Sequence, residues 1–115
     1  MKTYQMFGES LAVWFLNEWL KMGEPSQLQL VELGPGKGTL MVDILRTLSR
    51  LQPELVKALS VQLVEVSPRL RRQQEVALCG QGGSREGSSL TSWGCPVSWH
   101  SSLREVRILP SERLA

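Results

Sequence analysis

The sequence has few of the residues that build metal sites, and it has no long apolar run. Its 115 residues include two cysteines, Cys79 and Cys95, and one histidine, His100. The cysteines are too far apart for a C-x-x-C site, so we expect no bound metal and two ordinary thiols in a reducing compartment. No apolar run reaches the roughly 18 residues that a membrane span needs. We therefore expect no membrane span.

Charge and length set further limits. A formal net charge of +2, with 21% charged residues, makes nucleic acid or an anionic membrane an unexpected main partner. The length is near that of one small domain, so a second domain is not expected. Glu9, Asn17 and Glu18 interrupt the apolar residues near the N-terminus, which therefore lacks a clear targeting signal. A cytoplasmic location is expected if this is the complete product.

One segment carries the strongest functional signal. An apolar strand expected over residues 28–33 contains Glu32, and the spaced glycines Gly34, Gly36 and Gly38 follow it before a helix begins. Glycines let a backbone approach a nucleotide-like ligand, and a helix start offers free N–H groups. The G-x-G-x-G spacing fits neither the dinucleotide motif nor the phosphate-binding P-loop. It is the form seen in S-adenosylmethionine-dependent methyltransferases; the alternative is a tight turn without a ligand.

Strand and helix signals alternate along the chain. Strands are expected over residues 28–33, 59–66 and 96–100, and helices over 4–22, over 39–51 and from 67 onward. Alternation of this kind predicts a parallel α/β sheet with right-handed crossovers. The mostly apolar 28–33 segment is typical of a central strand buried on both faces. Trp14 and Trp19 have the helical spacing of core residues.

Two carboxylates are candidate ligand contacts. Glu65, near the end of the second strand, could accept hydrogen bonds from both hydroxyls of a ribose, or it could be a solvated strand-end carboxylate. Glu32 could bond an ammonium group directly or through water, or it could hold the glycine loop in shape; both interpretations remain open. Asp43 is expected to support its helix, and the arginines at 69, 71 and 72 to form an exposed helix face. Trp99 is the tryptophan most suited to a stacking contact.

Several blocks together resemble the MidA family, whose mitochondrial member is a protein-arginine methyltransferase that assembles complex I. The blocks are Gln5-Met6-Phe7-Gly8-Glu9, residues 31–40, residues 43–46, residues 63–70 with Gln73 or Gln74, and residues 97–100. The resemblance covers residues 5–78 well and extends weakly to about 106. A family block with Asn-Glu and Asp-Ala-Leu-Pro, which completes the active site, is absent. Residues 107–115 do not resemble the family.

The resemblance implies a fold, a cofactor and a reaction. Residues 1–106 would form the N-terminal part of a Rossmann-like class I methyltransferase α/β fold, with a mobile loop at 80–95 and a divergent tail at 107–115. The cofactor would be S-adenosyl-L-methionine, and the reaction would be symmetric dimethylation of an arginine on a complex I subunit in mitochondria. The implied cofactor-binding residues are Gly8, Glu32, Gly34, Gly36, Gly38 and Glu65. Catalytic residues are not identified.

Two alternatives to an active methyltransferase are kept. One is a truncated, non-catalytic form that acts as an interaction module, and the other is a different nucleotide-cofactor enzyme such as a dehydrogenase. Glycine spacing counts against the dehydrogenase. In the expected topology another strand would pair with residues 28–33. Without it this strand becomes a sheet edge, which predicts self-association and marginal stability.

Overall fold

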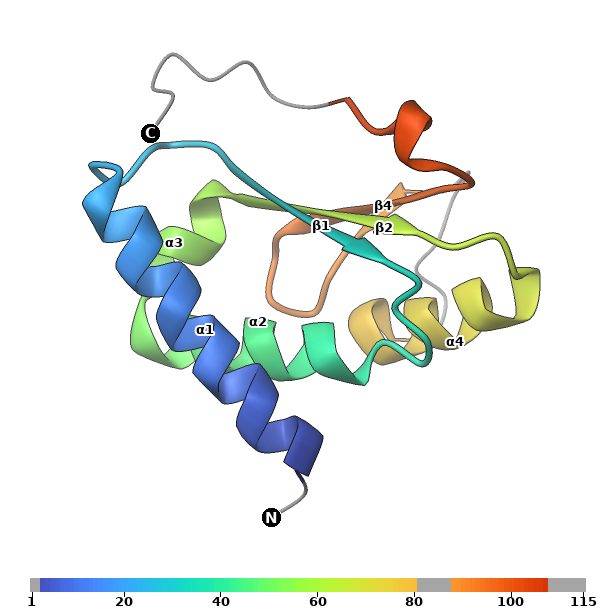
Figure 1. Ribbon diagram of the computed structural model, residues 1–115, viewed down its shortest axis with the longest axis horizontal. Helices are drawn as coiled ribbons and strands as arrows, with labels where there is room; N and C mark the ends of the chain where they lie inside the picture. The colour runs from blue at the N-terminus through green and yellow to red at the C-terminus, as the bar shows by residue number, and fades with distance from the viewer. Residues whose placement is uncertain (1–2, 81–87, 108–115) are drawn as a thin grey trace.

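The computed structural model describes residues 3–80 and 88–107, which form one mixed sheet with helices packed on one side (Figure 1). The sheet has the strand order β1-β2-β4-β3. Strands β1, β2 and β4 are parallel to one another, and β3 runs antiparallel to β4. The strands span Leu28–Leu33 (β1), Leu59–Val64 (β2), Ser88–Leu90 (β3) and Pro96–His100 (β4). A parallel α/β sheet was predicted and is confirmed for three of these strands.

The α-helices of the described residues lie below the sheet in Figure 1, all on the same face. They are α1 (Thr3–Lys21), α2 (Thr39–Leu51), α3 (Pro53–Ala58) and α4 (Pro68–Cys79), and a short 3₁₀ helix, η1, spans Leu103–Glu105. Each connection from one parallel strand to the next passes through this helical layer, as crossovers between parallel strands require. The start of α4 follows the prediction: Ser67 is its N-cap, with Oγ accepting the Leu70 N–H at 3.2 Å, and Pro68 occupies the first turn.

The core lies between the sheet and the helices. Leu30 of β1 is in register with Val61 of β2, which is in register with Val97 of β4, and all three are buried. On the opposite face of β1, Val31 and Leu33 are 37% and 61% exposed. Burial of β1 on both faces was therefore a wrong prediction. The α-helices of the described residues cover one face only, so the side chains of β1 alternate between core and solvent.

Element boundaries differ from the predictions in three places. β2 ends at Val64, two residues early, so Glu65 is the first residue after the strand. Helix α2 ends at Leu51 as predicted, but Pro53 then begins a short helix, α3, that was not predicted; at this position the missing N–H of proline costs no helical hydrogen bond. Strand β3 and helix η1 were not predicted because both are only three residues long. Residues 81–87 of the predicted 80–95 loop and 108–115 of the tail lie outside the described residues.

Helix α1 buries one of its two tryptophans. Trp19 lies in the core and its Nε1–H donates to the Pro25 carbonyl at 2.9 Å. Trp14 is 55% exposed and makes an edge-on contact with the ring of Phe15. The core prediction was right for Trp19 and wrong for Trp14. α1 carries apolar side chains on nearly every face, and helical spacing alone cannot say which face meets the sheet layer.

Candidate functional site

The glycine-rich loop joins the carboxyl end of β1 to the start of α2. Gly34, Gly36 and Gly38 have φ angles of +59°, +60° and +87°. L-residues with a Cβ rarely adopt this left-handed region, so the loop conformation itself requires glycine. A Cβ built at Gly34 or Gly36 would meet no heavy atom within 4 Å. These two positions therefore line open space that a ligand can enter against bare backbone.

Gly38 has a different surrounding. A Cβ at this position would lie 3.4 Å from the Gln74 Cα and 3.7 Å from the Ala77 Cβ. Gly38 thus lets the end of the loop approach the backbone of α4. Its N–H donates to the Pro35 carbonyl at 3.0 Å, and its carbonyl accepts the Val42 N–H at 3.1 Å as α2 begins. The first two glycines face open space, and the third brings two elements together.

Glu65 lies at the same edge of the sheet, directly after β2. Its N–H donates to the His100 carbonyl at 2.9 Å, which ties it to the end of β4. The side chain is buried, with Oε2 accepting the Ser67 N–H and Oε1 accepting Gln74 Nε2–H, both at 3.1 Å. A carboxylate has about four acceptor positions, so each oxygen retains capacity for a further hydrogen bond. Glu65 is not the solvated strand-end carboxylate that the sequence left open.

Gln74 was not predicted as part of this site, yet it contacts three of its elements. Its Nε2–H group donates to the Gly36 carbonyl at 2.6 Å as well as to Glu65, and its Oε1 accepts the Trp99 Nε1–H at 2.9 Å. A sequence signal existed: Gln74 lies four residues after Leu70 and four before Leu78, so a polar residue interrupts the apolar stripe of α4.

Glu32 occupies β1 two residues before the loop. Its Oε1 is buried and has no hydrogen-bond partner among the described residues. Burial raises the pKa of the Glu32 carboxyl above its ordinary value of 4.5, because removal from water disfavours the charged form. A buried carboxylate oxygen without a donor is costly for the chain alone. An ammonium group that reached it would relieve this cost.

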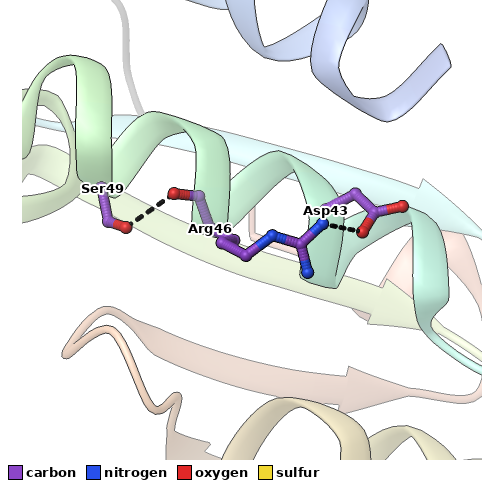
Figure 2. Close-up of polar contacts among 3 residues, drawn as sticks. All are labelled: Asp43, Arg46 and Ser49. Carbon is purple, nitrogen blue, oxygen red and sulfur yellow. Dashed lines mark hydrogen bonds and ion pairs between the residues drawn. The ribbon is translucent and has the colours of Figure 1, made fainter. Parts of the chain in front are cut away.

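Gly8 lies where α1 crosses α2. A Cβ at Gly8 would lie 2.7 Å from the Asp43 Cβ and 3.5 Å from Leu40 Cδ1, in the first two turns of α2. Figure 2 shows the Arg46 guanidinium bonded to Asp43 Oδ1, and the Ser49 Oγ–H bonded to the Arg46 carbonyl at 2.8 Å. Asp43 is buried, and its Oδ2 has no partner among the described residues. The surroundings of Gly8 are those of a helix contact one turn from the glycine loop.

The arginines of α4 do not form a uniformly exposed face. Arg71 is half-buried: its Nε–H donates to the Glu65 carbonyl at 2.6 Å and one terminal N–H group donates to Ser101 Oγ at 3.0 Å. The exposed-face prediction holds for the arginines at 69 and 72 and is wrong for Arg71. Trp99 is buried and hydrogen-bonded, and it forms part of the wall of a shallow pocket of about 220 Å³. The pocket is lined by Pro68, Arg71, Arg72, Glu75 and Trp99.

Other site types find no support in the described part of the chain. No group of three or more His, Cys, Asp and Glu side chains there is arranged to hold a metal ion. None of the helices described is long and apolar enough to cross a membrane. Cys79 and Cys95 are free thiols whose pKa values burial raises, which disfavours the reactive thiolate.

The glycine loop, Glu65 and the end of β4 meet at the carboxyl ends of three parallel strands. In Figure 1 the segments that leave β1 and β2 reach the same side of the sheet, next to α4. Open α/β sheets bind their ligands beyond the carboxyl ends of the strands. The fold and this edge define a Rossmann-like chain of the kind that holds nucleotide-type cofactors.

Comparison with known proteins gives the family. The model of a family described as "Putative S-adenosyl-L-methionine-dependent methyltransferase" matches residues 10–113. The chain therefore belongs to this methyltransferase family, and the Rossmann-like methyltransferase fold expected from its sequence is confirmed.

Curated relatives carry one recurring name. The chain is 45% identical over 111 residues to the mouse protein arginine methyltransferase NDUFAF7, mitochondrial, and 40% identical to the human protein of that name. It is 38% identical over 112 residues to the fruit-fly homolog. Each match covers 89% of this chain but only 25% or 26% of the relative. The chain thus spans about a quarter of the length of these relatives.

Proposed function

We propose that this chain binds S-adenosyl-L-methionine at the carboxyl edge of its sheet, as the donor-site part of a protein-arginine methyltransferase. The observation that carries the proposal is the bare backbone at Gly34 and Gly36, which faces open space while both residues hold left-handed conformations. The left-handed conformations alone account for glycine at these positions, so it is the open space in front of Gly34 and Gly36 that supports close approach of a ligand to the backbone.

Each predicted site residue has a role in this proposal, and the role of Gly38 is to let the end of the loop pack against α4. Gly34 and Gly36 lie along the methionine part of the cofactor, and the carboxylate of Glu65 accepts hydrogen bonds from the ribose hydroxyls. Glu32 bonds the amino-acid ammonium group. Its buried Oε1 has no hydrogen-bond partner among the described residues, which supports this role over that of holding the loop. Gly8 acts through packing, because it sets α1 against the helix that follows the loop.

The proposed reaction moves a methyl group to a guanidinium nitrogen of a protein arginine. S-adenosyl-L-methionine supplies an activated methyl on a sulfonium, and the nitrogen lone pair forms the new C–N bond as the C–S electron pair returns to sulfur. Holding both reactants in line is the main catalytic requirement, with carboxylates that orient the guanidinium and accept its proton. We propose a complex I subunit as protein substrate and mitochondria as location, in keeping with the mitochondrial relatives.

Ligand titration tests the proposal. S-adenosylhomocysteine added to the ¹⁵N-labelled chain should shift the amide signals of Gly34, of residues 36–38 and of Glu65. Glu65→Gln should weaken binding about tenfold through loss of charge-assisted hydrogen bonds. Glu54→Gln, at an exposed position of α3, is the matched control and should bind as the wild type does. An unchanged spectrum would contradict the proposal. Shifts caused by NADH instead would support the dehydrogenase alternative.

We also propose an interaction role, in which two copies of the chain associate through β1. Among the described residues β1 is the end strand of the sheet, and its Val31 and Leu33 side chains are exposed on the face that the described helices leave uncovered. Leu33→Lys should lower the self-association constant measured by analytical ultracentrifugation. Leu51→Lys makes the same change at an exposed leucine of α2 and should leave the constant unchanged. Equal association of both variants and wild type would contradict this role.

A further inference from the structure

Gln74 is the most buried polar side chain at the carboxyl edge. Its side chain is fully buried, with 0% relative exposure, and it lies in α4 between the glycine loop, the segment after β2 and strand β4. Both N–H donors of its amide are used, one on the Gly36 carbonyl at 2.6 Å and one on Glu65 Oε1 at 3.1 Å. The amide oxygen accepts the Trp99 indole N–H at 2.9 Å.

Trp99 fixes the direction of this amide. An indole N–H can only donate, so it must face the amide oxygen, and the NH₂ group is then turned toward two groups that can only accept. A rotated amide would place its oxygen against the Gly36 carbonyl and the Glu65 carboxylate, and its NH₂ group against the indole N–H. Each of the three contacts would become repulsive. The chain therefore has one arrangement for Gln74, and a buried network satisfied in this way is rigid.

The two acceptors held by Gln74 belong to the two parts of the proposed ligand site. The bond to Oε1 holds one side of the Glu65 carboxylate and, with the Ser67 N–H on Oε2, sets its plane. The bond to the Gly36 carbonyl fixes the peptide between Gly36 and Lys37. Because that peptide is trans, its N–H points to the side opposite α4.

We infer that Gln74 is a positioning residue for cofactor binding, which holds the Glu65 carboxylate and the Gly36–Lys37 peptide in the orientation the ligand needs. This inference rests on the proposed function, since Glu65 and the loop are its ligand contacts. Gln74 itself stays behind both groups, shielded from solvent. Loss of its NH₂ group leaves Glu65 and the loop in place but free to turn.

Two variants separate the parts of this network. Gln74→Glu keeps an acceptor for the Trp99 N–H but places a carboxylate oxygen where the NH₂ group was, next to Glu65. Gln74→Met keeps a similar volume and removes all three hydrogen bonds. Gln73→Met is the matched control: the same change at the preceding position of α4, whose Oε1 has no partner among the described residues. Thermal unfolding of each variant establishes that it is folded before binding is measured.

Calorimetric titration with S-adenosylhomocysteine should show about a tenfold loss of affinity for Gln74→Met, a larger loss for Gln74→Glu and less than about a twofold change for Gln73→Met. Two smaller ligands, adenosine and 2′,3′-dideoxyadenosine, report on the ribose contact, because only the first has the ribose hydroxyls. Wild type should prefer adenosine, and Gln74→Met should lose most of that preference because Glu65 then keeps only the Ser67 N–H of its two donors and can turn. A variant that was only less stable would weaken both probes equally.

The outcomes distinguish the inference from the proposed function. Wild-type chain that binds neither S-adenosylhomocysteine nor adenosine would contradict the proposed function, and the inference would fall with it. Wild-type binding matched within about twofold by both folded Gln74 variants would overturn the inference alone. Loss of affinity with the adenosine preference retained would also overturn it, because Glu65 would then be oriented without Gln74.

Discussion

Gly8 of α1 lies so close to Asp43 of α2 that a Cβ at position 8 would be 2.7 Å from the Asp43 Cβ. Cβ atoms in proteins do not approach this closely, so the crossing of the two helices depends on the missing side chain. The contact lies in the second turn of α2, and the glycine loop leads directly into that helix. The position of α1 is thereby linked to the loop that forms the proposed cofactor site.

Replacement of Gly8 by alanine tests this contact. Gly8→Ala should destabilise the fold by about 1–3 kcal/mol, because the added methyl group overlaps the Asp43 side chain and α1 must shift. Ser10→Ala, two residues along on the exposed side of α1, is the control and should be neutral or slightly stabilising. Urea unfolding followed by circular dichroism measures both. A gain of about 1 kcal/mol for Gly8→Ala, as at an exposed helical glycine, would contradict the contact.

Alanine substitutions at two glycines with open surroundings distinguish the cost of backbone strain from an effect on ligand binding. Gly36 and Gly94 have φ angles of +60° and +93°, and a Cβ at either would meet no heavy atom within 4 Å. Alanine at either position should cost about 1–2 kcal/mol from the left-handed backbone. Only Gly36→Ala should also weaken S-adenosylhomocysteine binding, by about tenfold or more, because its methyl group occupies ligand space. Equal affinities for the two variants would show that Gly36 is needed for the turn alone.

Much of the fold could be predicted because the local signals agree with the tertiary structure. The 28–33 strand, the glycine loop and the helix start at Ser67-Pro68 each have a backbone reason in the sequence, and the structure has all three. Burial was less predictable. Trp14 and Val31 look like core residues by spacing, but helices cover one face of the described sheet and one side of α1. Which face is covered depends on the packing of distant segments, which periodicity does not encode.

The candidate site was predictable where one residue carries the signal. Glu32 and Glu65 stand out as acids at strand ends, and the structure brings Glu65 to the end of β4 through the His100 carbonyl. Gln74 and Arg71 were missed, since their roles depend on partners 38 and 30 residues away in the chain. Such contacts appear only when the crossover geometry is known. A glutamine inside an apolar helical stripe was the one available sign.

The two thiols should react slowly in the folded chain. Burial raises the pKa of both Cys79 and Cys95 above the ordinary value of 9.0, so less thiolate is present near neutral pH. Reaction with Ellman's reagent should be roughly tenfold or more slower in buffer than in urea. Cys79, which is half-buried, should react before the buried Cys95, and Cys95→Ser identifies its signal. Rapid modification of Cys95 in the native chain would contradict its burial.

Glu32 should make the stability of the chain depend on pH in a defined direction. Its pKa is raised in the folded chain by burial, so the folded state binds more protons than the unfolded state above the ordinary value of 4.5. The contribution of Glu32 to stability is therefore greatest below pH 4.5 and is lost as the pH rises through the raised folded value.

Glu32→Gln removes this charge without changing the shape of the side chain. The variant should be more stable than wild type at pH 7, and the difference should shrink as the pH falls from the raised folded value toward the ordinary carboxyl value of 4.5. The pair is compared by thermal unfolding across this range, with Glu54→Gln on α3 as an exposed control that should show no such trend. If Glu32 bonds the ammonium group of the cofactor, the same substitution weakens S-adenosylhomocysteine binding while it stabilises the free chain. A variant that lost both stability and affinity would instead indicate that Glu32 supports the loop.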